Sequence, residues 1–554
     1  MTTIDTHATS APATSGSGLA GVAEWITTTD HKRIGRLYLG VSALAFLAAG
    51  VVGVLLGIQR VSPTRQFLPD ASLTQLFALE RFGLTYLALA PLVVGLAVAI
   101  VPLQVGARSL AFPRLAAAGF WAWLIGAGLA IYSLVLDGGP GGESRMYELF
   151  VLATALTLAG LLATIISLAT TILTARAPGM NMRRVPFFTW SVLIASVVSV
   201  VALPVIIGDL LYLFAAHHYP STSDLQANSA FADVVGFGFS QPTTILFAIP
   251  ALGLLADTVA TFTGQRLRPR GIIFTGIGLT GVGVFATVLQ APATIRAGFL
   301  DLGFGDQLKD VLPYAIVHLL PLLGVTIALG LAAKGLAAKP KISASLVFAL
   351  FAGLNVFGAF ASSALVHIGD AGLLGTVAEE GSWLCAVFAG VFAALAGVSY
   401  WAPKWWGRTL PTKATLPLAL LAFLGGELAT LSLLIAGFAD QPGTAFPLIT
   451  GERIPGTVLV DPIIRFDYSG PMGLWNALNA AGIGLVVLAV LGFVALAVKT
   501  FTGSGEAAGD DPFNGQTLEW ATTSPAPFAN FSDVHIVQSA EPLLDLKPSN
   551  RSDV

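Results

Sequence analysis

Charged residues are scarce in this sequence of 554 residues. Only 11% of them are Asp, Glu, Lys or Arg, whereas soluble domains carry about 25%, so most of the chain is expected to lie in lipid. The net charge of −3 provides no basic surface and argues against a nucleic-acid partner. The single cysteine, Cys385, lies in an apolar run, which excludes a disulfide framework and a cysteine metal site.

What the sequence has in abundance is long apolar runs. A membrane-spanning helix needs about 20 consecutive, mostly apolar residues, and the chain is 55% hydrophobic. These runs predict an all-α integral membrane protein with twelve transmembrane helices, near 37–57, 82–103, 118–136, 149–173, 188–214, 241–263, 273–293, 313–333, 344–364, 383–401, 416–438 and 474–498. One of them opens with Gln241 and Pro242 and is interrupted by Pro250.

The distribution of basic residues predicts the topology. Lys and Arg near the ends of spans stay on the cytoplasmic side, and with residue 1 inside, the inner loops hold more than twice as many of them as the outer loops. We therefore expect both termini to be cytoplasmic and the location to be the inner (plasma) membrane. Residues 1–24 lack an apolar core and a basic start, so they predict a flexible tail rather than a signal peptide. Residues 25–500 form the membrane domain, and 501–554 form a cytoplasmic tail.

Four segments resemble one family when they are taken in order. They are EWITTTDHKRIGRLYLG (24–40), VPLQVGARSLAFPRL (101–115), YWAPKWWGR (400–408) and DPFNGQTLEWATTSPAPFANF (511–531). Together they are similar to the haem-copper oxidase family, in particular to bacterial cytochrome c oxidase subunit I. The resemblance covers roughly residues 24–540. It implies a twelve-helix bundle of three quasi-symmetric arcs, and in the family six histidines hold two haems and a copper.

The resemblance places other residues at all six histidine positions. QLFALER (75–81) has Glu80 where the second span of the family has a histidine. The family motif His-Pro-Glu-Val-Tyr starts at Gln241 and ends at Ile245. The paired histidines of the seventh span become Gln290 and Ala291, and His-x-His of the tenth span becomes Gly381-Ser382-Trp383. We therefore expect no haem, no copper and no oxygen reduction by this chain.

The proton-path positions implied by the resemblance have changed as well. The entry aspartate becomes Ser109, the eighth-span lysine becomes Val325, and the sixth-span carboxylate becomes Thr243. Of the paired arginines that hold haem propionates, only Arg465 is present. Joint loss of ligands, proton entry and propionate clamp indicates loss of the chemistry rather than a change of metal.

The substituted residues allow two interpretations. Glu80, Gln241 and Gln290 would be a poor transition-metal site, because carboxamides are weak ligands and carboxylates prefer harder ions; the alternative is that the two glutamines hydrogen-bond between helices. Trp383 either fills the volume that a haem would occupy or is an ordinary interfacial tryptophan.

Ionisable groups inside the predicted spans are functional candidates. Glu427 and Asp257 are possible proton-binding groups, with a structural role as the alternative. His318 is a candidate proton relay, and His367 with it a relocated metal ligand. Glu80 is close enough to the outer end of its span to reach water, and Glu379-Glu380 are expected to cap the tenth span in water. The tail, with Trp520 and Phe531, suits an arm laid over the cytoplasmic face, packed on partner subunits or on its own bundle.

Three functions follow in order of preference. The first is a non-catalytic membrane subunit of an oxidase-like or respiratory complex, with other membrane subunits as partners. The second is a divergent terminal oxidase or electron-transfer subunit, passing electrons from cytochrome c or quinol to oxygen through relocated ligands. The third is a proton or ion pathway through Glu427 and Asp257.

Overall fold

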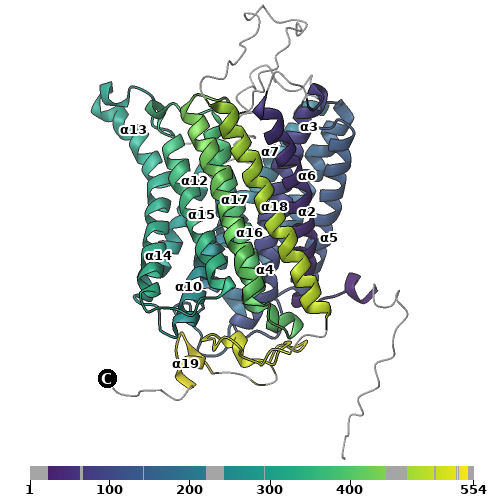
Figure 1. Cartoon of the computed structure of the whole chain (residues 1–554), viewed down its shortest axis with the longest axis vertical. Coiled ribbons are helices and arrows are strands. Elements are labelled where there is room, and N and C mark those ends of the chain that lie inside the picture. Colours follow the sequence, from purple (N-terminus) through teal and green to yellow (C-terminus); the bar gives the residue numbers. More distant parts are fainter. Residues whose placement is uncertain are drawn as a thin grey trace, which may run out of the picture.

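A computed structural model describes residues 23–62, 67–140, 142–219, 243–291, 293–443, 471–503, 507–531, 533 and 536–546. The described residues form an upright bundle of long helices (Figure 1). Twelve helical stretches are long and apolar enough to cross a membrane. This confirms the predicted all-helical fold with twelve spans.

Long helices and helix pairs make up the spans. Eight spans are essentially one helix each: α2 (His31–Val61), α5 (Pro113–Val135), α6 (Ser144–Thr174), α7 (Phe187–His218), α15 (Ala344–Val366), α16 (Val377–Trp406), α17 (Thr412–Phe438) and α18 (Met472–Thr502). The other four are interrupted. They are built from α3 (Asp70–Phe82), η1 (Gly83–Leu89) and α4 (Ala90–Gln104); α9 (Thr243–Leu246) and α10 (Pro250–Thr263); α11 (Arg270–Thr280), η4 (Gly281–Gly283) and α12 (Val284–Leu289); and α13 (Phe304–Tyr314), η6 (Ala315–Leu319) and α14 (Leu320–Leu336).

The interruptions have local causes. The break between α9 and α10 falls just before Pro250, which has no N–H to continue the hydrogen bonds of the preceding turn. Both η1 and η6 are π-helical, a geometry that frequently marks functional positions inside membrane and soluble helices. The π-helix η1 begins two residues after Arg81 and carries Thr85.

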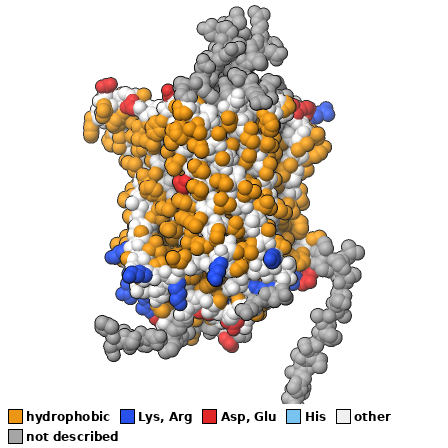
Figure 2. Space-filling view, in the orientation of Figure 1, with side chains coloured by type: hydrophobic (Ala, Val, Ile, Leu, Met, Phe, Trp, Pro, Cys, Tyr) orange, Lys and Arg blue, Asp and Glu red, His pale blue; other side chains and the backbone are white. Residues whose placement is uncertain are grey.

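One end of the bundle carries both the start of α2 and the C-terminal segment, where the ring of His31 hydrogen-bonds the side chain of Asn530. Figure 2 shows Lys and Arg side chains gathered at this end and an apolar belt above it. We call it the basic end and the other the opposite end. The distribution agrees with the expectation that the basic end is cytoplasmic, which stays a prediction.

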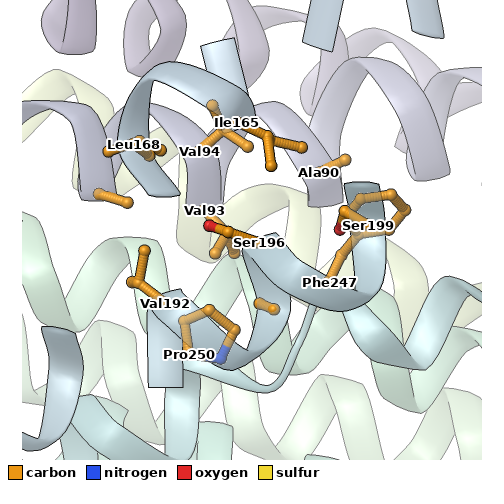
Figure 3. Close-up of a pocket in the computed structure, with 12 residues that line it drawn as sticks. Ala90, Val93, Val94, Ile165, Leu168, Val192, Ser196, Ser199, Phe247 and Pro250 are labelled. Carbon is orange, nitrogen blue, oxygen red and sulfur yellow. The ribbon is translucent and has the colours of Figure 1, made fainter. Parts of the chain in front are cut away.

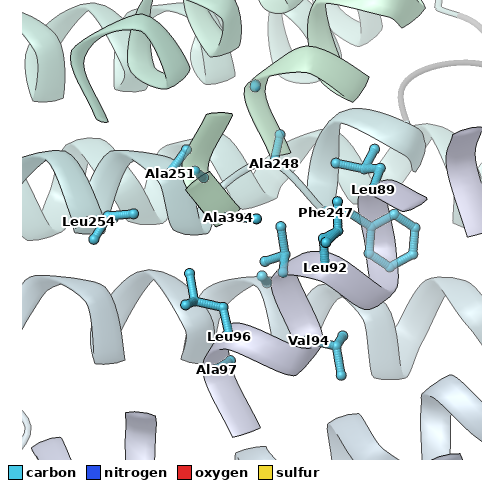
Figure 4. Close-up of a cluster of buried hydrophobic side chains, with 14 of the residues drawn as sticks. Leu89, Leu92, Val94, Leu96, Ala97, Phe247, Ala248, Ala251, Leu254 and Ala394 are labelled. Atoms are coloured by element: carbon cyan, nitrogen blue, oxygen red, sulfur yellow. The ribbon is translucent and has the colours of Figure 1, made fainter. Parts of the chain in front are cut away.

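The middle of the bundle is filled by apolar side chains. Figure 4 shows such a cluster from η1, α4, α10 and α16. Leu89 and Leu96 lie against Gly390 and Gly397 of α16 so closely that a Cβ atom on either glycine would be 2.1 or 2.5 Å from a leucine methyl carbon. The cavity in Figure 3, between α4, α6, α7 and Pro250, measures about 20 Å³, which is room for about one water molecule.

Candidate functional site

The candidate site is a cluster of four charged side chains between α2, α3 and α16, near the opposite end of the bundle. Arg60 comes from the last turn of α2, Glu80 and Arg81 from α3, and Glu380 from the first turn of α16. Two acidic and two basic groups balance one another. Arg60, Glu80 and Glu380 are each at most 5% exposed.

The Arg60–Glu380 pair is at the centre of this cluster. The Arg60 guanidinium donates two hydrogen bonds to the Glu380 carboxylate, Nη1 to Oε1 at 2.7 Å and Nη2 to Oε2 at 2.6 Å. Parallel bonds of this kind are charge-assisted and fix the orientation of both groups. Arg81 Nη2 is 3.9 Å from Glu380 Oε2. The expectation that Glu379-Glu380 cap the span in water is therefore wrong for Glu380.

Glu80 is buried in a space that a glycine provides. A Cβ atom at Gly53 of α2 would be 2.6 Å from Glu80 Oε1, closer than atoms can approach, so this carboxylate fits only because residue 53 has no side chain. Glu80 is 2% exposed. The expectation that it extends to water is therefore wrong, because its carboxyl group lies inside the bundle.

Trp383 forms the inner boundary of the charged cluster. Its side chain is fully buried, its Nε1–H donates to Thr85 Oγ1 at 2.9 Å, and the Arg81 guanidinium carbon lies 4.1 Å from its ring centre. Such a cation–π contact inside a protein stabilises both partners. The interfacial interpretation of Trp383 is wrong, because an interfacial tryptophan would reach the membrane surface.

These residues do not fit a haem. At Gly381, a Cβ atom would already be 3.0 Å from the backbone oxygen of Thr430 and 3.3 Å from the Leu433 Cβ atom, so α16 packs on α17 where the resemblance puts a histidine. Trp383 occupies the other histidine position of that motif, and Glu80 the one in the second span. None of the three offers an imidazole nitrogen with a free lone pair, the ligand that haem iron prefers, because the indole nitrogen of Trp383 can only donate a hydrogen bond.

The second group of substituted positions is spread over different environments. Gln290 ends α12 with a φ of 50°, and its Nε2 donates to both carboxylate oxygens of Asp209 on α7, at 2.7 and 2.8 Å. This confirms the interhelical hydrogen bond predicted for that glutamine. Ala291 is exposed and Ile245 is fully buried among apolar side chains, so neither would hold copper. Gln241 lies outside the described residues, as does Arg465.

His318 and His367 lie face to face rather than around a common point. Their ring centres are 4.4 Å apart with an interplanar angle of 27°. Both are buried, and the Nδ1 atom of His367 lies 2.7 Å from the backbone oxygen of Ser363. Burial lowers the pKa of His367. Within the described residues, no group of three or more His, Cys, Asp or Glu side chains is arranged to hold a metal ion.

Asp257 holds the start of α7. Its carboxylate accepts the backbone N–H groups of Phe187 and Phe188, both at 3.0 Å, which are among the donors that a helix N-terminus leaves without intrahelical partners. Gln104 Nε2 lies 3.3 Å from Asp257 Oδ2 and 3.1 Å from Glu519 Oε1. Asp257 therefore has hydrogen-bond partners that give it a structural role, and its proton-binding role stays a prediction.

The C-terminal arm (507–546) packs on its own bundle at the basic end. Glu519 of this arm is 1% exposed, and its Oε1 atom also accepts the Nε1–H of Trp401 at 3.1 Å. Burial raises the pKa of Glu519. Trp520 is buried against Tyr400. Of the two roles expected for the tail, packing on the chain itself is the one the structure contains.

The sequence alone does not reveal which residues pair with these acidic side chains. Arg60 ends an apolar stretch, GVLLGIQR, in the first span. An arginine at such a position needs a counter-ion, and this is the signal in the sequence that points to a buried acidic partner. Gln104 and Glu519 lie within two of the resembling segments, but nothing in their spacing indicates that they meet.

Known proteins are similar to this chain in both sequence and fold. The family described as "Cytochrome C and Quinol oxidase polypeptide I" matches residues 33–290. "Heme-copper oxidase subunit I+III" of Aeropyrum pernix is 30% identical over 94% of this chain, and the chain spans 63% of that longer protein. "Cytochrome c oxidase subunit 1" of Bacillus subtilis is 26% identical, with 94% of this chain and 82% of that protein covered.

A solved structure has the same fold. The cryo-EM structure of a heme-copper terminal oxidase dimer superposes with a TM-score of 0.64 over 90% of this chain and 88% of that chain, at 14% identity. The fold and the matches define a multi-pass membrane protein of the subunit I type. In sequence and in fold, the chain is similar to subunit I of the haem-copper oxidases, cytochrome c oxidase subunit 1 among them.

Proposed function

We propose that this chain is a redox-inactive subunit I homologue that serves as a membrane subunit of an oxidase-like or respiratory complex. The observation that supports this most strongly is the Arg60–Glu380 pair with Glu80, Arg81 and Trp383 around it. In the resemblance, this is where a low-spin haem has its ligands. Two carboxyl groups, two guanidiniums and an indole occupy the space. Arg60 and Arg81 pair with Glu380, and Arg81 lies over the Trp383 ring.

The packing of the interior supports the same proposal. A metal cofactor needs a preformed cavity lined by its ligands and by partners that orient them. Here Leu89 and Leu96 press against Gly390 and Gly397, and Ile245 is enclosed by apolar neighbours. Five of the six ligand positions lie within the described residues, and none of these five supplies an imidazole.

Relatives named as oxidase subunits give the context for the role in a complex. The fused name "Heme-copper oxidase subunit I+III" joins two subunits in one chain, and the present chain matches 63% of it. A chain with the subunit I fold but without redox centres would keep the surfaces that hold such an assembly together. We place this complex in the plasma membrane, with the basic end in the cytoplasm.

Activity and assembly can be measured on the same sample. The chain, tagged in its own host and solubilised in mild detergent, should migrate with other membrane proteins, above its own mass of 57.3 kDa. After separation from them, it should consume no oxygen with reduced cytochrome c or with a quinol as donor. A family member that keeps the six histidines is the positive control. Sustained oxygen consumption by the isolated chain would favour the divergent oxidase instead.

A further inference from the structure

A cavity of about 240 Å³ lies between α15, α16 and α17, and its lining includes Gly381, the neighbour of Glu380 in the sequence. Leu354 and Leu431 line it and are 41% and 51% exposed, so the cavity opens sideways toward lipid rather than toward either membrane surface. Figure 2 shows acidic side-chain atoms within the apolar belt of the face to which α15 and α17 belong in Figure 1.

Glu427 brings a carboxylate into this cavity at the middle of the membrane. It lies two residues past residue 425, the midpoint of α17. Within the described residues it forms no ion pair, and its polar contact is with the amide of Asn355, whose Nδ2 atom is 3.5 Å from Glu427 Oε1. A hydrogen bond of that length is weak. The described residues therefore give the Glu427 carboxylate neither a counter-ion nor a strong hydrogen bond.

Asn355 gives a second, independent sign that the cavity is incomplete. Its side chain is 1% exposed, and its Oδ1 atom has no hydrogen-bond partner in the described part of the chain. Its Nδ2 also donates to the backbone oxygen of Phe351 at 3.0 Å. A buried carbonyl oxygen without a donor is destabilising. The acceptor that the cavity presents is therefore the Glu427 carboxylate, with the buried Asn355 amide beside it, and it calls for a donor that carries positive charge.

We propose that this cavity receives the Lys or Arg side chain of a transmembrane helix from a partner subunit. This deepens the proposed function, on which it rests, by assigning one of the interaction surfaces of the complex. Lys and Arg carry several donors and no acceptor, which complements the Glu427 carboxylate. The exposed lining residues Leu354 and Leu431 offer an apolar surface on which the partner helix can pack.

Other occupants fit the cavity less well. A lipid headgroup lies at the membrane surface, about 15 Å from the middle of the hydrocarbon core, whereas Glu427 lies near the midpoint of its span. A proton alone would neutralise Glu427 but would leave the space of about 240 Å³ unfilled. A cationic side chain on a helix supplies charge, donors and volume together.

The probe for this proposal is a synthetic apolar helix of about 23 residues, built from leucine and alanine with one lysine at its centre. A matched helix carries glutamine in the same place. Each is labelled with an acceptor dye and reconstituted with the donor-labelled full chain in phosphatidylcholine vesicles. We expect energy transfer to show about tenfold tighter association of the lysine helix than of the glutamine helix. Glu427→Gln should abolish the difference, and Leu420→Ala, on the exposed side of α17, should keep it.

Cys385 locates the docked helix. It lines the cavity and is the only cysteine of the chain, so a probe with one cysteine a helical turn from its lysine should form an oxidative cross-link to the wild type. The cross-link should be lost in Cys385→Ser and in Glu427→Gln. If Glu427→Gln fails to fold, a probe with central glutamate gives the matching test, since the wild type should exclude it.

Equal association of the lysine and glutamine helices with the wild type would overturn the proposal. So would a proton leak in vesicles of the chain alone that Glu427→Gln removes, since the carboxyl would then carry protons. Neither result bears on whether the chain binds haem, which is measured separately. A chain without haem and without a preference for the lysine helix would refute this inference and leave the proposed function standing.

Discussion

Arg60 and Glu380, which are 320 residues apart in the sequence, form two hydrogen bonds of 2.7 and 2.6 Å inside the helix bundle. They join the end of the first span to the start of the tenth. Both groups are 5% exposed or less, and each charge is therefore dependent on the other. Breaking a buried ion pair on one side costs about 3–5 kcal/mol, whereas replacing both partners by apolar residues is often neutral.

This pair gives the first prediction. Glu380→Gln should lower the thermal stability of the purified protein by about 3–5 kcal/mol, because the Arg60 charge is left buried without its carboxylate. The double variant Arg60→Met/Glu380→Leu should recover most of that loss. Asp301→Asn, at an exposed position, is the control and should change stability by less than about 0.5 kcal/mol. Equal stability of Glu380→Gln and the wild type would show that the pair does not hold these spans together.

Gly53 and Glu80 give a second prediction by steric exclusion. Gly53→Ala should place a methyl group 2.6 Å from Glu80 Oε1 and force the carboxylate out of its position, destabilising the fold by about 1–3 kcal/mol. Shortening the partner, in Gly53→Ala/Glu80→Ala, should relieve the clash, so the two effects are expected to be non-additive. Thermal unfolding of the wild type, the two single variants and the double variant measures this non-additivity. Strict additivity would mean that Glu80 does not lie against Gly53.

The packing role of Trp383 is tested by shortening it stepwise. Trp383→Ala removes the indole from a fully buried position and should cost about 3–5 kcal/mol, as such truncations do in other cores. Trp383→Phe keeps most of the ring and loses the bond to Thr85, so its cost should be about 1–2 kcal/mol. A thermal-shift assay on the wild type, Trp383→Phe and Trp383→Ala should show stability falling in that order. An alanine variant as stable as the wild type would show that the indole fills no essential volume.

Some of this site could be predicted from the sequence, and some could not. The twelve spans follow from apolar runs alone, and the exchange of histidine for Glu80 and Trp383 is visible once the resembling segments are aligned. The burial of Glu380 was not visible. Two adjacent glutamates at the start of a span are typical of a water-exposed helix cap, and only Arg60, far away in sequence, reverses that reading. Long-range pairing of this kind is set by the packing of both α2 and α16 on the span that contains η1 and α4, which no local pattern encodes.

The C-terminal arm should be held more weakly as pH rises. Burial raises the pKa of Glu519 in the folded state above the value of about 4.3 for an exposed glutamate. Its stabilisation is therefore fully present below that value and is lost as pH rises through the higher, folded pKa, because the unfolded arm ionises more readily. Limited proteolysis of the arm should accelerate as pH rises above about 4.3 and through the raised pKa of Glu519.

Glu519→Gln provides the control for that experiment. An amide at this position stays neutral, so most of the pH dependence of cleavage should disappear. A smaller part can remain because Asp257 lies on the other side of Gln104 in the same network. The same acceleration with pH in Glu519→Gln and in the wild type would assign the effect to other groups.

The haem and metal content of the purified chain tests the central claim most directly. An absorption spectrum, a pyridine haemochrome assay and elemental analysis should be made on full-length protein from its own host, grown with iron and copper in excess. With Glu80 and Trp383 at haem-ligand positions and Gly381 packed on α17, we predict no Soret band and less than about 0.1 iron or copper per chain. A Soret band with one or more haem irons per chain would contradict the account.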